Sequence, residues 1–169
     1  MLYAKAAPGE NVIVRGARVL DPTESVDAVL DVRIDDGTIV ELGARLDPNA
    51  HRVIEAEGLT LAPAFVDPHV HLRTPGREDE ETIASGTHAA AAGGYCAILA
   101  MPNTDPVVDS AAVLGSLVET AGAEAQIPVG FLAAITKGQE GAELTEMAEL
   151  ADAGAAGFTD DGRPVTAPG

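Results

Sequence analysis

Two histidines separated by one residue are the most informative chemical feature of the sequence. His69 and His71 lie in an apolar stretch that begins at Phe65. Side chains two residues apart in a strand point to the same side, so the two imidazoles face one direction. Neutral imidazole nitrogens bind Zn²⁺ well. A His-x-His pair on an arbitrary strand is more often incidental, so its position in the fold decides whether it is a metal site.

Two further polar clusters follow apolar stretches of the chain. Asn103 lies in Met101-Pro102-Asn103-Thr104, and Asp160 and Asp161 lie in Thr159-Asp160-Asp161-Gly162. Asn103 and Asp161 each have a simpler interpretation as a turn residue. Neighbouring residues face different ways, so we expect at most one of the two aspartates to be a metal ligand.

The first third of the chain reads as a small β unit. Asp35-Asp36-Gly37 separates two alternating apolar segments and predicts a tight hairpin turn, because such turns need positive φ at their central residues. A further one or two strands are expected within 51–61. The other expected strands cover 11–14, 29–34 and 38–42.

From Phe65 onward the pattern alternates between apolar strands and helices, which indicates parallel βα units and an α/β fold. We count four such units, and we interpret them as the first half of a (β/α)8 TIM barrel. A closed barrel needs eight units, so we expect this chain to be an amino-terminal piece. The alternative is a complete, small, open α/β sheet. The expected strands are 65–72, 95–101, 127–135 and 156–159, and the expected helices are 80–92, 111–121 and 144–153.

Barrel active sites form at the carboxyl ends of the strands. His69 and His71 lie at the carboxyl end of the first strand of this series, Asn103 follows the second strand and Asp161 the fourth. We therefore expect these side chains to lie on one face. This position favours metal binding far more than a His-x-His pair on an arbitrary strand does.

Composition excludes several other functions. The chain has 10 basic and 27 acidic side chains and a formal net charge of −17, which disfavours nucleic acids and anionic membranes as partners. The single cysteine excludes an internal disulfide, and there is no long apolar run, so a cytoplasmic location is expected.

The ordered set of motifs resembles the dihydroorotases of the long bacterial type, in the amidohydrolase superfamily. The resemblance covers essentially the whole chain. That superfamily flanks its barrel with a small β-sandwich, which implies a β-sandwich portion at 1–62 and the first half of a metal-dependent hydrolase barrel at 63–169. The motifs that carry the resemblance are 63–73, Gly93-Gly94-Tyr95, 101–104 and 158–162.

The resemblance also implies a role for each candidate residue. His69 and His71 would bind one or two zinc ions, and Asp161 would be a further ligand able to bridge two metals. Arg73 and Asn103, together with His71, would bind the substrate. Arginine offers a planar fork of donors that suits a carboxylate, and the asparagine amide adds a neutral donor.

The implied reaction is the reversible cyclisation of N-carbamoyl-L-aspartate to L-dihydroorotate in pyrimidine biosynthesis. A bound metal ion lowers the pKa of water and polarises the carbonyl group. The resemblance places the proton-shuttling aspartate and further histidine ligands beyond residue 169, so no catalytic acid or base is assigned within this chain. We expect the isolated piece to be inactive. A homodimer and a complex with aspartate carbamoyltransferase are the implied assemblies.

Three alternatives remain open from the sequence. Other cyclic amidases, such as hydantoinase or allantoinase, usually bridge their metals with a carboxylated lysine at the fourth strand, whereas this sequence has no lysine after Lys137 and offers Asp161. A non-catalytic scaffold partner of aspartate carbamoyltransferase is disfavoured because the expected ligands are present. The third alternative is a binding or folding module without activity.

Overall fold

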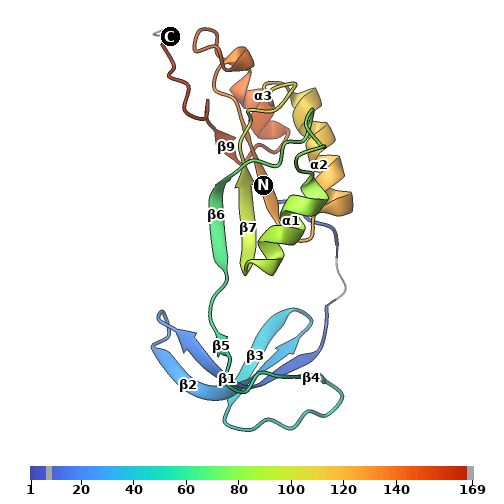
Figure 1. Ribbon diagram of the computed structural model, residues 1–169, viewed down its shortest axis with the longest axis vertical. Helices are drawn as coiled ribbons and strands as arrows, with labels where there is room; N and C mark the ends of the chain where they lie inside the picture. Colours follow the sequence, from blue (N-terminus) through green and yellow to red (C-terminus); the bar gives the residue numbers. More distant parts are fainter. Residues whose placement is uncertain (7–8, 167–169) are drawn as a thin grey trace. The chain divides into compact units, whose positions relative to one another are not determined.

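The computed structural model describes residues 1–6 and 9–166. The chain divides into two compact units, Ala7–Pro63 and a second unit that combines Met1–Ala6 with Ala64–Gly169. Figure 1 shows the first unit as strands and the second as strands with helices. In the part of the chain that the structure describes, we find no helix that is long and apolar enough to cross a membrane.

The first unit is a five-stranded sheet of order β3-β2-β1-β4, with β5 also paired to β1. The strands β1 and β2, and β2 and β3, are antiparallel, whereas β4 and β5 run parallel to β1. Ile13, Ala17 and Val32 form the most deeply buried part of this unit. The strands are β1 (Val12–Asp21), β2 (Val26–Asp35), β3 (Thr38–Gly43), β4 (Arg52–Glu55) and β5 (Thr60–Leu61).

The predicted hairpin turn between β2 and β3 is confirmed. Asp35 pairs with Thr38, and the two residues between them, Asp36 and Gly37, have φ values of 49° and 76°. Positive φ at both central positions matches the twist of the flanking strands, and an aspartate followed by a glycine tolerates it.

A buried aspartate closes a bulge in β1. The β1–β2 register shifts between Val14 and Ala17, and Gly16 adopts a φ of 71° at this point. The carboxylate of Asp31 accepts a hydrogen bond from the Gly16 backbone N–H at 2.9 Å and another from the Leu46 backbone N–H at 3.0 Å. The Arg15 guanidinium lies 3.5 Å from the same carboxylate. These contacts tie the bulge to the segment after β3.

The ionisation of Asp31 should make the β unit sensitive to acid. Burial raises the pKa of Asp31, but the hydrogen bonds from Leu46 and Gly16 and the charge of Arg15 outweigh it, so the net pKa lies below the ordinary value. A carboxylate with a depressed pKa stabilises the fold above its unfolded pKa of about 3.9, and this stabilisation is lost as the pH falls through the lower folded pKa.

We therefore expect Asp31→Asn to lower the free energy of unfolding by about 1–3 kcal/mol at pH 7, because it leaves buried donors poorly paired. The difference from the unsubstituted protein should shrink below about pH 4. Calorimetric unfolding between pH 7 and pH 3 measures both effects. Asp36→Asn, at an exposed turn position, is the control; a difference at pH 7 no larger than that of the control would contradict the prediction.

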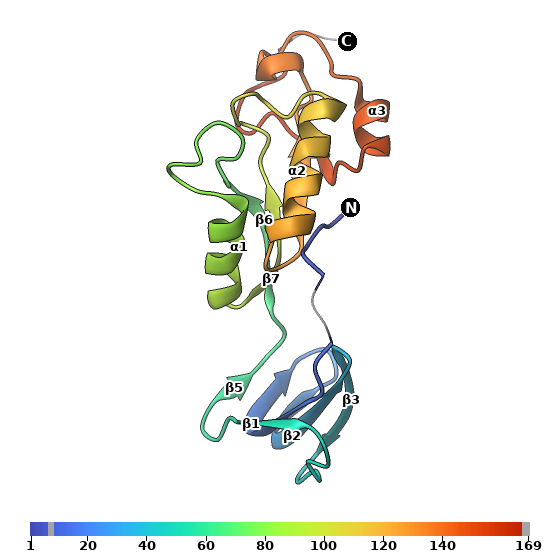
Figure 2. The same cartoon turned by 90° about the vertical axis from the view of Figure 1, so that its right-hand side faces the viewer.

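The second unit is built on a four-stranded sheet of order β6-β7-β8-β9 in which all neighbours are parallel. This confirms the predicted α/β class and the four strands in series. Figures 1 and 2 show helices α1 and α2 side by side on one face of the sheet. The elements are β6 (Phe65–Val70), α1 (Ile83–Ala92), β7 (Tyr95–Ala100), α2 (Ala111–Glu124), β8 (Val129–Ala133), a 3₁₀ turn (Lys137–Gln139), α3 (Met147–Asp152) and β9 (Gly157–Phe158).

The amino terminus packs with this second unit rather than with the β unit. Tyr3 forms an antiparallel bridge with Val129 at the start of β8, with backbone hydrogen bonds of 2.8 Å in both directions. The division expected at residue 62 placed residues 1–6 with the β unit. Local sequence does not reveal such a pairing, because the two partners are more than a hundred residues apart in the chain.

The core of the second unit lies between the sheet and the helices. Leu114, Leu117 and Ala121 form a buried stripe on α2, and they pack with Ile98 of β7 and Phe131 of β8. The spacing of the α2 residues places them on one face of the helix. This packing holds the carboxyl ends of β7 and β8 on a rigid support.

Two helices are shorter than predicted, for local reasons. α1 begins at Ile83 rather than residue 80, because Thr82 and Ser85 form a reciprocal capping box. α3 begins at Met147 rather than 144, because Leu144 bridges to Thr136 and the Thr145 hydroxyl donates to the Ala134 carbonyl at 2.8 Å. The residues before α3 therefore cover the end of β8 instead of extending the helix.

Candidate metal centre

An irregularity in β6 presents the two histidines. Along the pairing with β7, Asp67 is opposite Ile98 and Val70 is opposite Ala100, so β6 carries one extra residue between these pairs. Pro68 lies in this bulge and has no N–H to donate to the ladder. The Asp67 carboxylate accepts the His69 backbone N–H at 3.0 Å and holds the bulge. Bulges of this kind redirect side chains at the ends of strands.

His69 lies in this bulge and His71 just after the strand, and their side chains lie together. Their ring centroids are 5.3 Å apart and the rings meet edge to face at 62°. His69 is the last but one residue of β6, and His71 follows the strand directly. Both imidazoles are therefore available to one small ligand.

A turn after β9 brings the third candidate ligand to the histidines. Asp161 has a φ of 44° and Gly162 a φ of 76°, a left-handed pair like that of the hairpin turn at Asp36. The Asp161 backbone N–H is held by the Thr159 hydroxyl at 3.1 Å. One carboxylate oxygen of Asp161 lies 3.0 Å from Nε2 of His69, and its side chain is only 12% exposed.

The three side chains form a cluster that fits a metal ion. His69, His71 and Asp161 each offer one ligand atom, and these atoms all lie within 4.8 Å of one another. Two imidazole nitrogens and one carboxylate oxygen are donors that Zn²⁺ prefers, and ligands at about 2 Å from one cation fall within this separation. The residues that are present therefore fit the metal that the sequence motifs imply.

Asn103 connects two of these residues. The Oδ1 atom of Asn103 lies 2.9 Å from Nδ1 of His71. The Nδ2 atom of Asn103 donates a hydrogen bond to Oδ2 of Asp161 at 2.7 Å. The sequence placed Asn103 on the same face as the histidines, which is confirmed. These two contacts were not predicted, because they depend on loops that follow three different strands.

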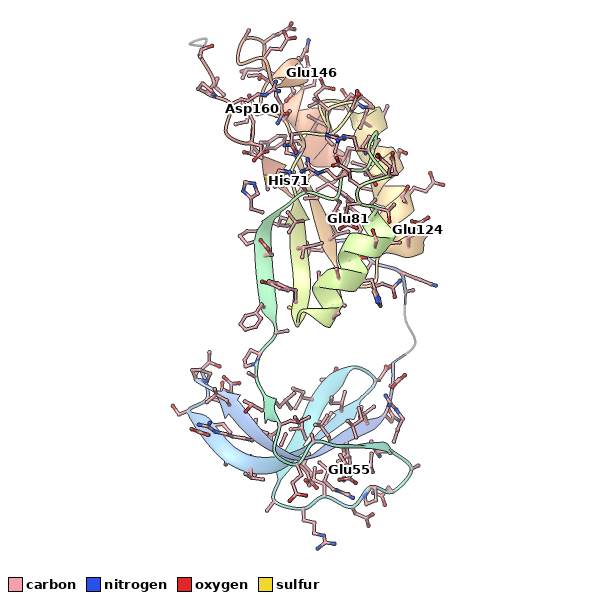
Figure 3. All side chains as sticks on the ribbon, viewed as in Figure 1. Glu55, His71, Glu81, Glu124, Glu146 and Asp160 are labelled. Carbon is pink, nitrogen blue, oxygen red and sulfur yellow. The ribbon has the colours of Figure 1, made fainter. Side chains whose placement is uncertain are left out.

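Asp160 faces away from its neighbour and is buried, at 3% exposure. Its carboxylate accepts hydrogen bonds from the Ile135 backbone N–H at 2.8 Å, the Thr136 backbone N–H at 3.1 Å and the Thr136 hydroxyl at 2.6 Å. It thus ties the loop after β9 to the loop after β8. Figure 3 shows Asp160 and His71 near the same end of the sheet.

Arg73 lies beside the cluster, in a small pocket. Arg73, Arg77, Asn103 and Thr104 are among the residues that line this pocket of about 120 Å³. The Arg73 Nε atom is 3.5 Å from a carboxylate oxygen of Glu80, and Arg73 has a φ of 58°, which is uncommon for a residue with a side chain. Arg73 and Asn103 thus line one small space, which Asp105 also lines.

Solved structures of cyclic amidases share this fold. The structure superposes on "L-Hydantoinase (Dihydropyrimidinase) from Arthrobacter aurescens" with a TM-score of 0.72 and 25% identity, covering 88% of this chain and 32% of that one. It also matches a dihydropyrimidinase from Brevibacillus agri NCHU1002 with a TM-score of 0.62 and 30% identity, covering 75% of this chain and 27% of that one.

Curated relatives and a family match identify the sequence more closely. A dihydroorotase from Geobacter sp. (strain M21) is 47% identical over 156 residues, which are 92% of this chain and 37% of the relative. A dihydroorotase from Syntrophobacter fumaroxidans is 45% identical over an alignment of 170 positions, which covers 98% of this chain and 38% of the relative. The chain thus spans well under half the length of these relatives. The sequence model of the dihydro-orotase-like family matches residues 58–169, and the chain belongs to this family.

Proposed function

We propose that the chain supplies the amino-terminal metal-binding part of a dihydroorotase, which interconverts N-carbamoyl-L-aspartate and L-dihydroorotate in pyrimidine biosynthesis. The observation that carries the proposal is the convergence of His69, His71 and Asp161 within 4.8 Å. The three side chains come from the end of β6 and from the turn after β9. The identity of 47% to a dihydroorotase supports the choice of reaction.

In the hydrolytic direction, water adds to the carbonyl carbon of the ring amide, the C–N bond breaks and the nitrogen leaves with a proton. A zinc ion, when bound, supplies Lewis acidity that polarises the carbonyl group and makes water a better nucleophile. The side chains of His69, His71 and Asp161 hold this ion. We propose that the remaining ligands and the carboxylate that moves the proton come from the rest of the protein.

Arg73 and Asn103 orient the substrate. Both line the same pocket, and a substrate carboxylate there accepts the fork of the guanidinium group and an N–H of the amide. A chain with a net charge of −17 repels an anionic substrate at long range. Local positive charge must therefore attract the substrate carboxylate within the Debye length of about 8 Å. Arg73 and a bound cation meet this requirement.

We propose a cytoplasmic enzyme, assembled as a homodimer or with aspartate carbamoyltransferase.

The hydantoinase alternative is less well supported by the site. A carboxylated lysine requires a neutral amine, whereas a hydrogen bond to Glu143 and the negative charges of Glu143, Glu146 and Asp109 raise the pKa of Lys137. Lys137 follows β8 and pairs with Glu143 instead of joining the cluster. Asp161 takes the position at the end of the fourth barrel strand.

Turnover measured with and without zinc tests the proposed function. We expect the full-length protein to interconvert carbamoyl aspartate and dihydroorotate, to lose activity when a chelator removes the metal and to regain it with zinc. The 169-residue chain alone should show no turnover. Activity that survives complete metal removal would overturn the metal-dependent mechanism, and faster turnover of hydantoin or allantoin would favour the other cyclic amidases. Robust turnover by the 169-residue chain would overturn the view that further groups are needed.

A further inference from the structure

The amide of Asn103 is joined by hydrogen bonds to two of the proposed metal ligands. When Asp161 is the carboxylate that a metal ligand must be, these contacts have one consistent arrangement of donors and acceptors. An ionised carboxylate only accepts hydrogen bonds. The Asn103 atom that lies 2.7 Å from Oδ2 of Asp161 must therefore be the amide nitrogen, because an amide oxygen there would face another acceptor. The carboxylate thus determines the orientation of the amide.

The orientation of the amide in turn determines the tautomer of His71. With the nitrogen directed to Asp161, Oδ1 of Asn103 faces Nδ1 of His71 at 2.9 Å. A carbonyl oxygen only accepts, so Nδ1 must carry the proton. In a neutral imidazole the other nitrogen, Nε2, then has the free lone pair that a metal ion requires.

The same contacts distinguish the two oxygens of Asp161. Oδ2 accepts from Asn103, whereas Oδ1 lies 3.0 Å from Nε2 of His69. A cation held between His69 and Asp161 is therefore approached by Oδ1, while Asn103 restrains the other oxygen. Partners that hold metal ligands in this way typically contribute 10–100-fold to metal affinity.

We infer that Asn103 is a positioning residue of the metal centre as well as a substrate-binding residue: it holds His71 as the Nδ1–H tautomer and Asp161 with Oδ1 toward the metal. The two roles are compatible, because the amide nitrogen has a second N–H that remains for a substrate carboxylate. The inference rests on the proposed metal centre and extends the role of Asn103 beyond substrate binding.

Zinc affinity of the full-length protein, measured by competition with a chelator in the absence of substrate, tests this role. We expect Asn103→Ala to weaken zinc binding about 10–100-fold. Arg73→Ala is the matched control, because Arg73 lines the same pocket and pairs with Glu80 rather than with a proposed ligand. It should raise the KM and leave the zinc affinity unchanged. Unchanged zinc affinity in Asn103→Ala, with only a raised KM, would overturn the inference.

The tautomer provides a second readout that does not depend on folding stability or turnover. In the metal-free full-length protein labelled with ¹⁵N-histidine, we expect His71 to be protonated at Nδ1, with its signals assigned through a His71→Gln variant. Asn103→Ala, which removes the acceptor oxygen beside Nδ1, should lose this preference. A His71 protonated at Nε2 in the unsubstituted protein would contradict the inference.

Both readouts are obtained without substrate, so they separate this inference from the proposed reaction. A full-length protein with the expected tautomer and zinc affinities but without dihydroorotase activity would refute the proposed reaction and support the role of Asn103. Dihydroorotase activity together with unchanged zinc affinity in Asn103→Ala and a His71 protonated at Nε2 would refute the role of Asn103 and leave the proposed reaction standing.

Discussion

Asp161→Asn in the full-length protein is expected to reduce zinc affinity by more than the 10–100-fold that follows the loss of an outer partner, and to abolish zinc-dependent turnover. The reason is that an amide oxygen is a much weaker zinc ligand than a carboxylate oxygen, and the negative charge of Asp161 beside His69 is lost. Asparagine adopts positive φ readily, so the substitution preserves the φ of 44° at this turn.

The chain contains a matched control for this substitution. Asp36 has a φ of 49° and precedes Gly37, whose φ of 76° equals that of Gly162 after Asp161. Asp36→Asn therefore makes the same chemical change in the same backbone conformation, in a turn outside the metal cluster. It should leave zinc content and turnover unchanged. Equal zinc content and equal rate in Asp161→Asn and Asp36→Asn would remove Asp161 from the site.

The second large effect is expected at Asp160. Asp160→Ala should lower the free energy of unfolding by about 3 kcal/mol or more, because it leaves the two N–H groups of Ile135 and Thr136 and the Thr136 hydroxyl without their acceptor. Calorimetry or denaturant unfolding of the full-length protein measures this loss. Zinc affinity should also decrease, since the turn that carries Asp161 is no longer tied to the loop after β8.

Asp152 provides the comparison for this substitution. It is exposed at the end of α3, so Asp152→Ala should change the free energy of unfolding by no more than about 0.5 kcal/mol. The loss of free energy of unfolding in Asp160→Asn should lie between those in Asp160→Ala and Asp152→Ala. Asparagine retains one acceptor oxygen but places an NH₂ group near buried donors. A loss in Asp160→Ala no larger than that in Asp152→Ala would show that the buried network is not needed for stability.

The acidic tripeptides illustrate how far local sequence can be interpreted. Asp35-Asp36-Gly37 and Thr159-Asp160-Asp161-Gly162 contain the same Asp-Asp-Gly sequence and form turns with the same signs of φ. The local backbone was predictable, because aspartate and glycine tolerate the left-handed region. The chemical role was not contained in the tripeptide. It follows from the strand that each turn terminates: the turn after β9 brings Asp161 to His69.

The sequence by itself determined the alternation of strands and helices, and the common face for the two histidines, Asn103 and Asp161. These follow from side-chain periodicity and from the shared direction of parallel strands, which are local or topological properties. The tertiary structure alone decided which atoms meet: the Asn103 amide between His71 and Asp161, the buried anchor of Asp160, and the pairing of Tyr3 with Val129. Such contacts join residues that are far apart in the chain, and they depend on packing to within an ångström, which no periodicity encodes.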